Sequence, residues 1–266
     1  MIQTNGTNEN CPICDGRGWT IKRDEGVGTA VPCGCRRSEE EALRTGLAAV
    51  PERYLSCTLD GFHVSNPDPA TADQLFSAKK QSQDYADSFV GENGRFRDTG
   101  LLFIGAPGVG KTHLAVALLN ELIRRYRVRG LFVDFTELIH DIQSTFSPRS
   151  AESKFDLLHP VMNAEVLVLD ELGAQKPSEW VNDILHLILN KRYTNRLPSI
   201  FTTNYRLDGP FRKGESLDRG PDFDSPELLS QRVRPSLLSR MYEMARPIVI
   251  EAGDYRRDIR CAQNRL

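Results

Sequence analysis

A glycine-rich loop between a short apolar run and a helical pattern constrains this chain more than any other feature. Residues 101–104 have the length and composition of a buried strand, and the apolar spacing over 114–123 predicts a helix. Between them lies the pattern G-x-x-x-x-G-K-T at 105–112. In this context the backbone N–H groups of the loop turn inward, and the helix N-terminus adds partial positive charge. The sequence therefore predicts a nucleotide-binding protein.

The loop offers specific groups to a bound nucleotide. We expect Lys111 to reach the β- and γ-phosphates of ATP, and the Thr112 hydroxyl to bind Mg²⁺. The candidate nucleotide-binding residues are the loop itself and the histidine after it: Gly105, Ala106, Pro107, Gly108, Val109, Gly110, Lys111, Thr112 and His113.

Polar residues follow two later strand patterns. The apolar run 166–169 ends in Asp170 and Glu171, and a strand expected over 199–203 ends at Asn204. An aspartate at such a position can hold Mg²⁺ through its water shell, and an adjacent glutamate can polarise the attacking water. Asn204 would lie beside the γ-phosphate. Acidic pairs also occur on ordinary surfaces, and asparagine is a common turn former. The order downstream of a phosphate loop favours the functional interpretation.

Two cysteine pairs near the start of the chain indicate a metal site. The spacing suits a tetrahedral four-thiolate zinc site, with the ligands Cys11, Cys14, Cys33 and Cys35. A disulfide pair and a reactive redox pair are the alternatives. The disulfide is unfavourable if the chain is cytosolic, because thiols are kept reduced in the cytosol. Cys57 and Cys261 stand alone and are interpreted as packing or incidental residues.

Strand patterns alternate with helical patterns along most of the chain, which predicts an α/β fold with a parallel sheet covered on both faces. We expect strands at 101–104, 131–135, 166–169, 199–203 and 247–251. Helices are expected at 70–89, 112–125, 136–146 (capped by Thr136), 152–162 and 178–193, followed by a helix from Pro226 that Pro235 interrupts and that resumes over 236–244.

The length and charge of the chain limit its organisation. Its 266 residues suit one large domain and a small module. We expect a zinc-binding module at 1–37, a linker at 38–50 and an ATPase domain at 51–266. The net charge of −2 gives no overall basic field for nucleic acid. The polar start and the lack of a long apolar run predict a cytoplasmic protein without membrane contact.

Several stretches of residues 50–266 resemble the AAA+ ATPases of the bacterial helicase-loader group, the DnaC/DnaI type, and the related IstB transposition helpers. These stretches are VPERY at 50–54, CTLDGF at 57–62, the phosphate loop, VLDELG at 168–173 and FTTN at 201–204. The paired cysteines and SEWV at 178–181 are similar to the DnaI branch. The resemblance implies an AAA+ core with a five-stranded parallel sheet between helices, preceded by a zinc module.

The resemblance also implies roles for three residues outside the phosphate loop. Asn204 matches the first sensor, and Arg256 matches the second. Arg240 matches the arginine finger, which reaches the γ-phosphate bound to a neighbouring subunit. It follows that the protein would self-associate through its ATP site. Without the resemblance, both arginines would be interpreted as surface cations.

Partners are implied in the same way. The family places single-stranded DNA along the inner face of an open spiral, and the residues expected there are Phe146, Lys176, Ser178 and Trp180. Helical spacing alone is equally compatible with a core role for the two aromatic residues. The zinc module would dock on a replicative helicase. Its acidic residues balance its cations, which favours a protein partner over direct contact with nucleic acid.

The sequence thus predicts an ATP-hydrolysing loader that delivers or opens a replicative DNA helicase on single-stranded DNA. One alternative is an IstB-like transposition helper of the same enzyme class with a transposase partner. A second is a nucleotide-gated adaptor with little hydrolysis. The presence of both Glu171 and Arg240 argues against the adaptor, because a pure switch would not need both.

Overall fold

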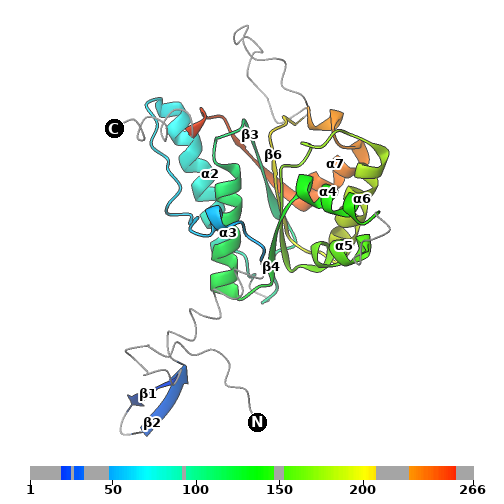
Figure 1. The fold of residues 1–266 in the computed structure, drawn as a ribbon. Helices are drawn as coiled ribbons and strands as arrows, with labels where there is room; N and C mark the ends of the chain where they lie inside the picture. The colour runs from blue at the N-terminus through cyan, green and yellow to red at the C-terminus, as the bar shows by residue number, and fades with distance from the viewer. Residues whose placement is uncertain are drawn as a thin grey trace.

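A computed structural model describes residues 19–24, 27–32, 48–91, 94–146, 153–207 and 228–255. Near the N-terminus, β1 (Trp19–Asp24) pairs antiparallel with β2 (Val27–Pro32) as a hairpin. From residue 48 onward the chain forms three layers, with helices on both faces of one sheet (Figure 1). Within the described ranges, no helix combines the length and the apolar character needed to cross a bilayer.

The central sheet has five strands, all parallel, in the order β4-β5-β6-β3-β7. Its members are β3 (Gly100–Gly105), β4 (Gly130–Asp134), β5 (Val166–Asp170), β6 (Ser199–Thr203) and β7 (Ala245–Ile250). The expected five-stranded parallel sheet is confirmed. Because the strands run the same way, the residues that follow β3, β5 and β6 meet at one edge of the sheet, where ligands of α/β proteins bind.

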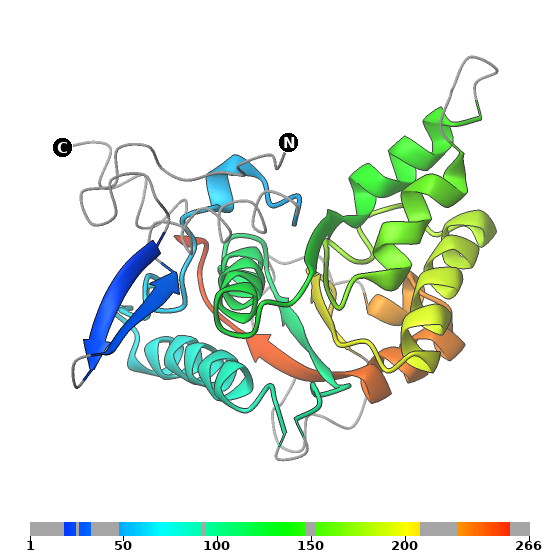
Figure 2. The same ribbon diagram turned by 90° about the horizontal axis from the view of Figure 1, so that it is seen from below.

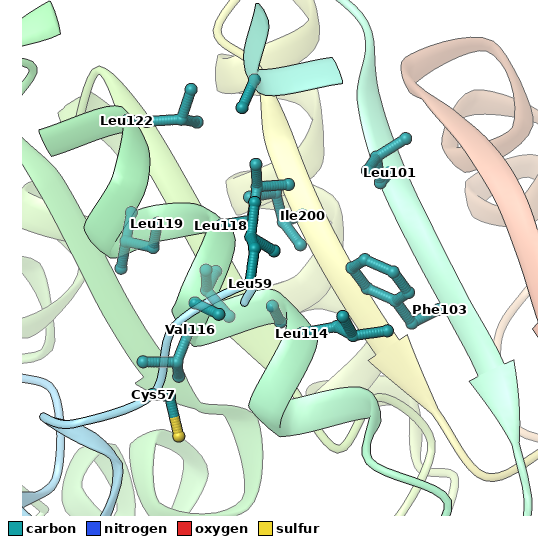
Figure 3. Packing of buried hydrophobic residues seen from close by; sticks show 14 of the residues in the cluster. Cys57, Leu59, Leu101, Phe103, Leu114, Val116, Leu118, Leu119, Leu122 and Ile200 are labelled. Atoms are coloured by element: carbon teal, nitrogen blue, oxygen red, sulfur yellow. The ribbon is translucent and has the colours of Figure 1, made fainter. Parts of the chain in front are cut away.

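Alternating strand residues build two separate hydrophobic clusters, one on each face of the sheet. Leu101 and Phe103 of β3 face the helices α2 (Pro69–Asp87) and α3 (Lys111–Tyr126). Figure 3 shows Leu114 and Leu118 of α3 packed above this face of the sheet.

The opposite face carries Leu102, Ile104, Leu167 and Phe201. Four helices cover it: α4 (Phe135–Ser144), α5 (Lys154–Asn163), α6 (Glu179–Thr194) and α7 (Pro235–Met244). Figure 2 shows the two groups of helices on either side of the strands. Both faces are therefore apolar, as parallel strands require.

The boundary between β4 and α4 differs from the sequence prediction. The expected strand 131–135 ends one residue earlier, and Phe135 is already helical and buried. The cap is Asp134 and not Thr136, because the Asp134 carboxylate accepts hydrogen bonds from the backbone N–H groups of Thr136 (2.7 Å) and Glu137 (3.1 Å).

The helix expected from Pro226 is also wrong in its described part. Residues 228–234 contain only a short 3₁₀ turn, η2 (Leu229–Gln231). Helix α7 then begins at Pro235. Proline fits the first turn of a helix because its missing N–H would have no partner there. Pro235 therefore starts this helix and does not interrupt one.

A buried arginine ties α6 to β6 and α5. The Arg192 side chain is fully buried, and its guanidinium donates to the Ser199 hydroxyl (2.8 Å) and to the carbonyls of Pro198 (2.8 Å), Ala164 (2.8 Å) and Val161 (3.1 Å). Burial lowers its pKa to about 9, so it stays protonated at neutral pH. These bonds fix the start of β6, the strand whose far end carries Asn204.

Candidate nucleotide-binding site

A cleft of about 1000 Å³ opens at the edge of the sheet where β3, β5 and β6 end. The phosphate-loop residues 107–112 line it together with His113, Glu171 and Asn204. The structure thus brings most of the motif residues to one place, although they come from three separate strands.

Two glycines shape the loop between β3 and α3. Gly108 and Gly110 have φ angles of 85° and 97°, a region that residues with a Cβ rarely adopt. A Cβ on Gly108 would come within 2.0 Å of the Asp254 carboxylate, and one on Gly110 within 2.6 Å of the Phe62 ring. Helix α3 begins at the next residue, so the N–H groups of its first turn, which have no acceptor within the helix, lie at the cleft.

Lys111 lies at the start of α3 and is only 7% exposed. Its ammonium group donates to the Ala106 carbonyl of its own loop at 2.8 Å. The cation is therefore held over the loop whose N–H groups would bind phosphate oxygens.

Asp170 is the most buried acidic residue of the site, with 4% of its surface exposed. The Thr112 hydroxyl lies 3.1 Å from each of its carboxylate oxygens, and the Thr202 hydroxyl donates to Oδ1 at 2.5 Å. Burial raises the pKa of Asp170 to about 6, and the carboxylates of Glu171 and Asp134 act in the same direction. The hydrogen bonds from the two threonines oppose that rise.

The pair Thr112 and Asp170 fits a magnesium ion. Carboxylate and hydroxyl oxygens are hard ligands of the kind that Mg²⁺ takes beside nucleotide phosphates. A buried carboxylate with a raised pKa also gains from a neighbouring cation, because the cation favours the ionised form. These two residues would hold the ion.

Glu171 is exposed at the cleft and has a backbone φ of 57°. A left-handed conformation costs a residue with a Cβ about 1–2 kcal/mol. The backbone N–H of Glu171 donates to the Thr202 hydroxyl at 3.0 Å, and its carbonyl accepts from Ala174 at 3.1 Å. Such strain, supported by its surroundings, is common where a side chain must point into an active site.

The second wall of the cleft comes from residues to which the sequence analysis assigned no role in the site. These residues belong to the segment before α2 and to the segment after β7. The aromatic or basic residues among them are Arg53, Tyr54, Phe62, His63 and Tyr255. The rings of His63 and Tyr255 lie 5.6 Å apart between centroids, which joins the two segments. The stretches 50–54 and 57–62, which carry the family resemblance, were the available signal in the sequence. Flat rings at this wall can hold a nucleobase.

The candidate arginines lie elsewhere. Arg240, on α7, is not among the described residues that line the cleft of its own chain. Its guanidinium donates to the Asn190 side chain at 2.9 Å and lies 6.0 Å from the centre of the Tyr193 ring. Arg256, the candidate second sensor, falls outside the described residues.

The candidate DNA residues gather near the start of α6. Phe146, 62% exposed, meets the partly buried Trp180 edge to face, with ring centroids 5.9 Å apart. Ser178 caps α6, because its hydroxyl accepts from the Val181 N–H at 3.1 Å. Lys176 is exposed beside them in the chain. The serine thus has a structural task of its own, whereas Phe146 and Lys176 present a ring and a cation to solvent.

The four candidate zinc ligands lie outside the described residues. Among the residues that are described, no group of three or more histidine, cysteine or acidic side chains could hold a metal. The lone Cys57 is buried, as expected of a packing residue, and burial raises the pKa of its thiol.

Replacing Lys111 by alanine is expected to weaken ATP binding at least about tenfold, because a charge-assisted contact to phosphate is lost from a nearly buried position. Titration with a fluorescent ATP analogue measures this loss. The exposed Lys80→Ala on α2 is the matched control and should bind as wild type does. Unchanged affinity in the Lys111 variant would remove the loop from the nucleotide site.

Comparison with known proteins adds independent information on this fold and site. The family described as IstB-like ATP binding protein matches residues 88–210. A crystal structure of the DnaC helicase loader aligns with a TM-score of 0.57 and 31% sequence identity, covering 75% of this chain and 99% of that one.

Two curated relatives are similar over different lengths. The replicative helicase loader DnaC of Escherichia coli K12 is 28% identical over 155 residues, and the match spans 58% of each chain. The phage-like element PBSX protein XkdC of Bacillus subtilis is 24% identical over 220 residues, 81% of this chain and 79% of that protein. The sequence match therefore spans under two thirds of the curated Escherichia coli DnaC protein.

Proposed function

Since this chain belongs to the family of DnaC-type helicase loaders, AAA+ proteins with an ATP-binding domain, we propose that it delivers or opens a replicative DNA helicase on single-stranded DNA at the cost of ATP. One observation carries the proposal. Lys111 and Glu171 line one cleft, and Asp170 lies behind it against Thr112, in a chain that matches a helicase-loader structure over 99% of that structure's length.

The proposed chemistry is attack of water on the γ-phosphate of ATP. Lys111 and the loop N–H groups would bind the phosphates, and Asn204 would orient the water. Glu171 would accept the proton of that water, because its carboxylate is exposed in the cleft. Thr112 and Asp170 would hold Mg²⁺, which would supply neutralisation of the phosphate charge. Catalysis is then mostly positioning and charge stabilisation.

A complete site would need two copies of the chain. Arg240 does not line the cleft of its own chain, which agrees with action on the nucleotide of a neighbour. Its contacts with Asn190 and Tyr193 keep the guanidinium near the surface of α7 and α6. Self-association through the ATP site is therefore part of the proposal.

The exposed ring of Phe146, supported by Trp180, and the cation of Lys176 would form the contact to single-stranded DNA. Bases stack on aromatic rings without regard to sequence, and cations bind the phosphate backbone. A loader needs contact of this sequence-tolerant kind.

We also propose that residues 1–37 form a zinc module that docks on the helicase, joined by a linker at 38–50 to the ATPase domain at 51–266. In the hairpin, Trp19 pairs with Pro32, so the two chain ends of the hairpin lie side by side. Cys11 and Cys14 precede that end in the sequence, and Cys33 and Cys35 follow it. This order supports one shared zinc ion.

An IstB-like transposition helper is the second candidate, because the matching family model is described as IstB-like ATP binding protein. It would share the ATP chemistry and differ in the partner. Capture experiments separate the two: the full chain and a variant without residues 1–37 are used to isolate partners from host lysate. Replicative helicase retained by the full chain alone supports the loader with docking through the module. A transposase captured in its place supports the helper. Capture of neither a helicase nor a transposase would contradict both candidates.

Zinc analysis tests the module separately. About one zinc per chain is expected in freshly reduced protein. The double variant Cys14→Ser/Cys33→Ser should lose it, because two thiolate ligands are removed from a four-ligand site. Cys57→Ser should keep the metal. Protein that contains no zinc after reduction and desalting would eliminate the site and leave the ATPase assignment intact.

A further inference from the structure

One buried hydroxyl connects the two acidic residues of the site. Thr202 lies on β6, between the phosphate-loop strand β3 and the acidic strand β5, and is 1% exposed. We propose that Thr202 is a positioning residue that holds Asp170 and Glu171 in fixed relative orientation for ATP hydrolysis. This inference rests on the proposed function, and nothing in the sequence motifs assigns the residue a role.

The direction of both hydrogen bonds follows from chemistry. The Thr202 hydroxyl lies 2.5 Å from Oδ1 of Asp170 and 3.0 Å from the backbone nitrogen of Glu171. A hydroxyl has one proton to donate, and a backbone N–H can only donate. Thr202 therefore accepts from Glu171 and donates to Asp170.

Each of these bonds restrains a different degree of freedom. Thr112 on α3 and Thr202 on β6 contact the Asp170 carboxylate from two separate elements, so rotation of that carboxylate breaks at least one bond. The bond to the Glu171 N–H supports the left-handed backbone, with φ of 57°, from which the glutamate side chain leaves the strand. Thr202 thus acts through the two carboxylates and not on the substrate.

The next residue supplies a matched comparison. Thr203 is also fully buried, and its hydroxyl donates to the Leu172 carbonyl at 2.7 Å and accepts from the Tyr205 N–H at 3.2 Å. It has the same chemistry and burial as Thr202 on the same strand, but its hydroxyl bonds to backbone groups and to neither carboxylate. Thr203→Val removes a buried hydroxyl without releasing Asp170.

The experiment compares Thr202→Val, Thr202→Ser and Thr203→Val in the full-length protein. Thr202→Val is expected to lower kcat for ATP about tenfold, a larger effect than its effect on KM, as loss of a residue that orients a metal ligand does. Addition of Mg²⁺ should increase the affinity of the wild-type protein for a fluorescent ATP analogue, and this increase should be several-fold smaller in Thr202→Val. Thr202→Ser restores the hydroxyl and should stay within about twofold of wild type in both measurements.

Thr203→Val is expected to lower the thermal midpoint about as much as Thr202→Val while kcat stays within about twofold. Equal kcat values in the two valine variants would overturn the positioning role, as would a serine variant that recovers nothing. Should valine prevent folding, Thr202→Ala and Thr203→Ala give the same comparison. If the wild-type protein hydrolyses no ATP, the proposed function fails. In that case the role of Thr202 is tested by binding alone: a Mg²⁺-dependent increase in nucleotide affinity that is the same in Thr202→Val and in wild type overturns it.

Discussion

Glutamine in place of Glu171 is expected to leave the affinity for Mg²⁺-ATP within about threefold of wild type and to lower kcat at least about a hundredfold. The side chain is exposed at the cleft, so an amide of the same size disturbs no core packing. The amide cannot accept the proton of the attacking water, however, and the loss falls on turnover. Phosphate release under saturating ATP measures kcat, and titration with a fluorescent ATP analogue measures affinity.

A glutamate before the same strand provides the control. Glu165 precedes β5 at the end opposite Glu171, where its carboxylate pairs with Arg129 at 3.2 Å. Glu165→Gln removes the same charge from the same segment and should keep wild-type turnover. A Glu171→Gln protein that retains more than about a fifth of wild-type kcat would show that another group accepts the proton.

Alanine in place of Arg240 is expected to lower kcat by about a thousandfold while nucleotide affinity stays near wild type. The guanidinium contacts Asn190 and Tyr193 on the surface of α6 and does not line its own cleft. Under the proposed function its charge therefore acts on the phosphoryl group bound to a neighbouring copy. Turnover per chain in the wild-type protein should accordingly rise with protein concentration.

Mixing two inactive variants gives the sharper test of action between copies. The Arg240→Ala chain keeps Glu171, and the Glu171→Gln chain keeps Arg240, so one of their shared interfaces contains both groups. The mixture should regain activity that neither variant has alone. Arg234→Ala is the control. Arg234 directly precedes α7, and its guanidinium also bonds to α6, through Asp183 at 2.8 Å. A mixture that assembles and stays inactive would contradict the shared site.

The sequence determined those features that depend on neighbours along the chain. The strand, glycine loop and helix around Lys111 appear where the pattern predicted them, since a tight loop with positive φ at Gly108 and Gly110 requires those residue types locally. The alternation of apolar strands and helices likewise predicted a parallel sheet of five strands, because buried parallel strands need apolar residues on both faces. Element ends were less certain, and the cap at Asp134 was missed.

Which distant residues share the site depends on how the strands are ordered in the sheet. The order β4-β5-β6-β3-β7 places β6 between the strands that carry the phosphate loop and the acidic pair. That position brings the Thr202 hydroxyl to Asp170, 32 residues away in the chain. The aromatic wall around His63 and Tyr255 arises in the same way, from segments near opposite ends of the described core. Sequence periodicity reports which face of a strand is buried and carries no information on which strands are neighbours, so these contacts follow from the packing of the whole sheet.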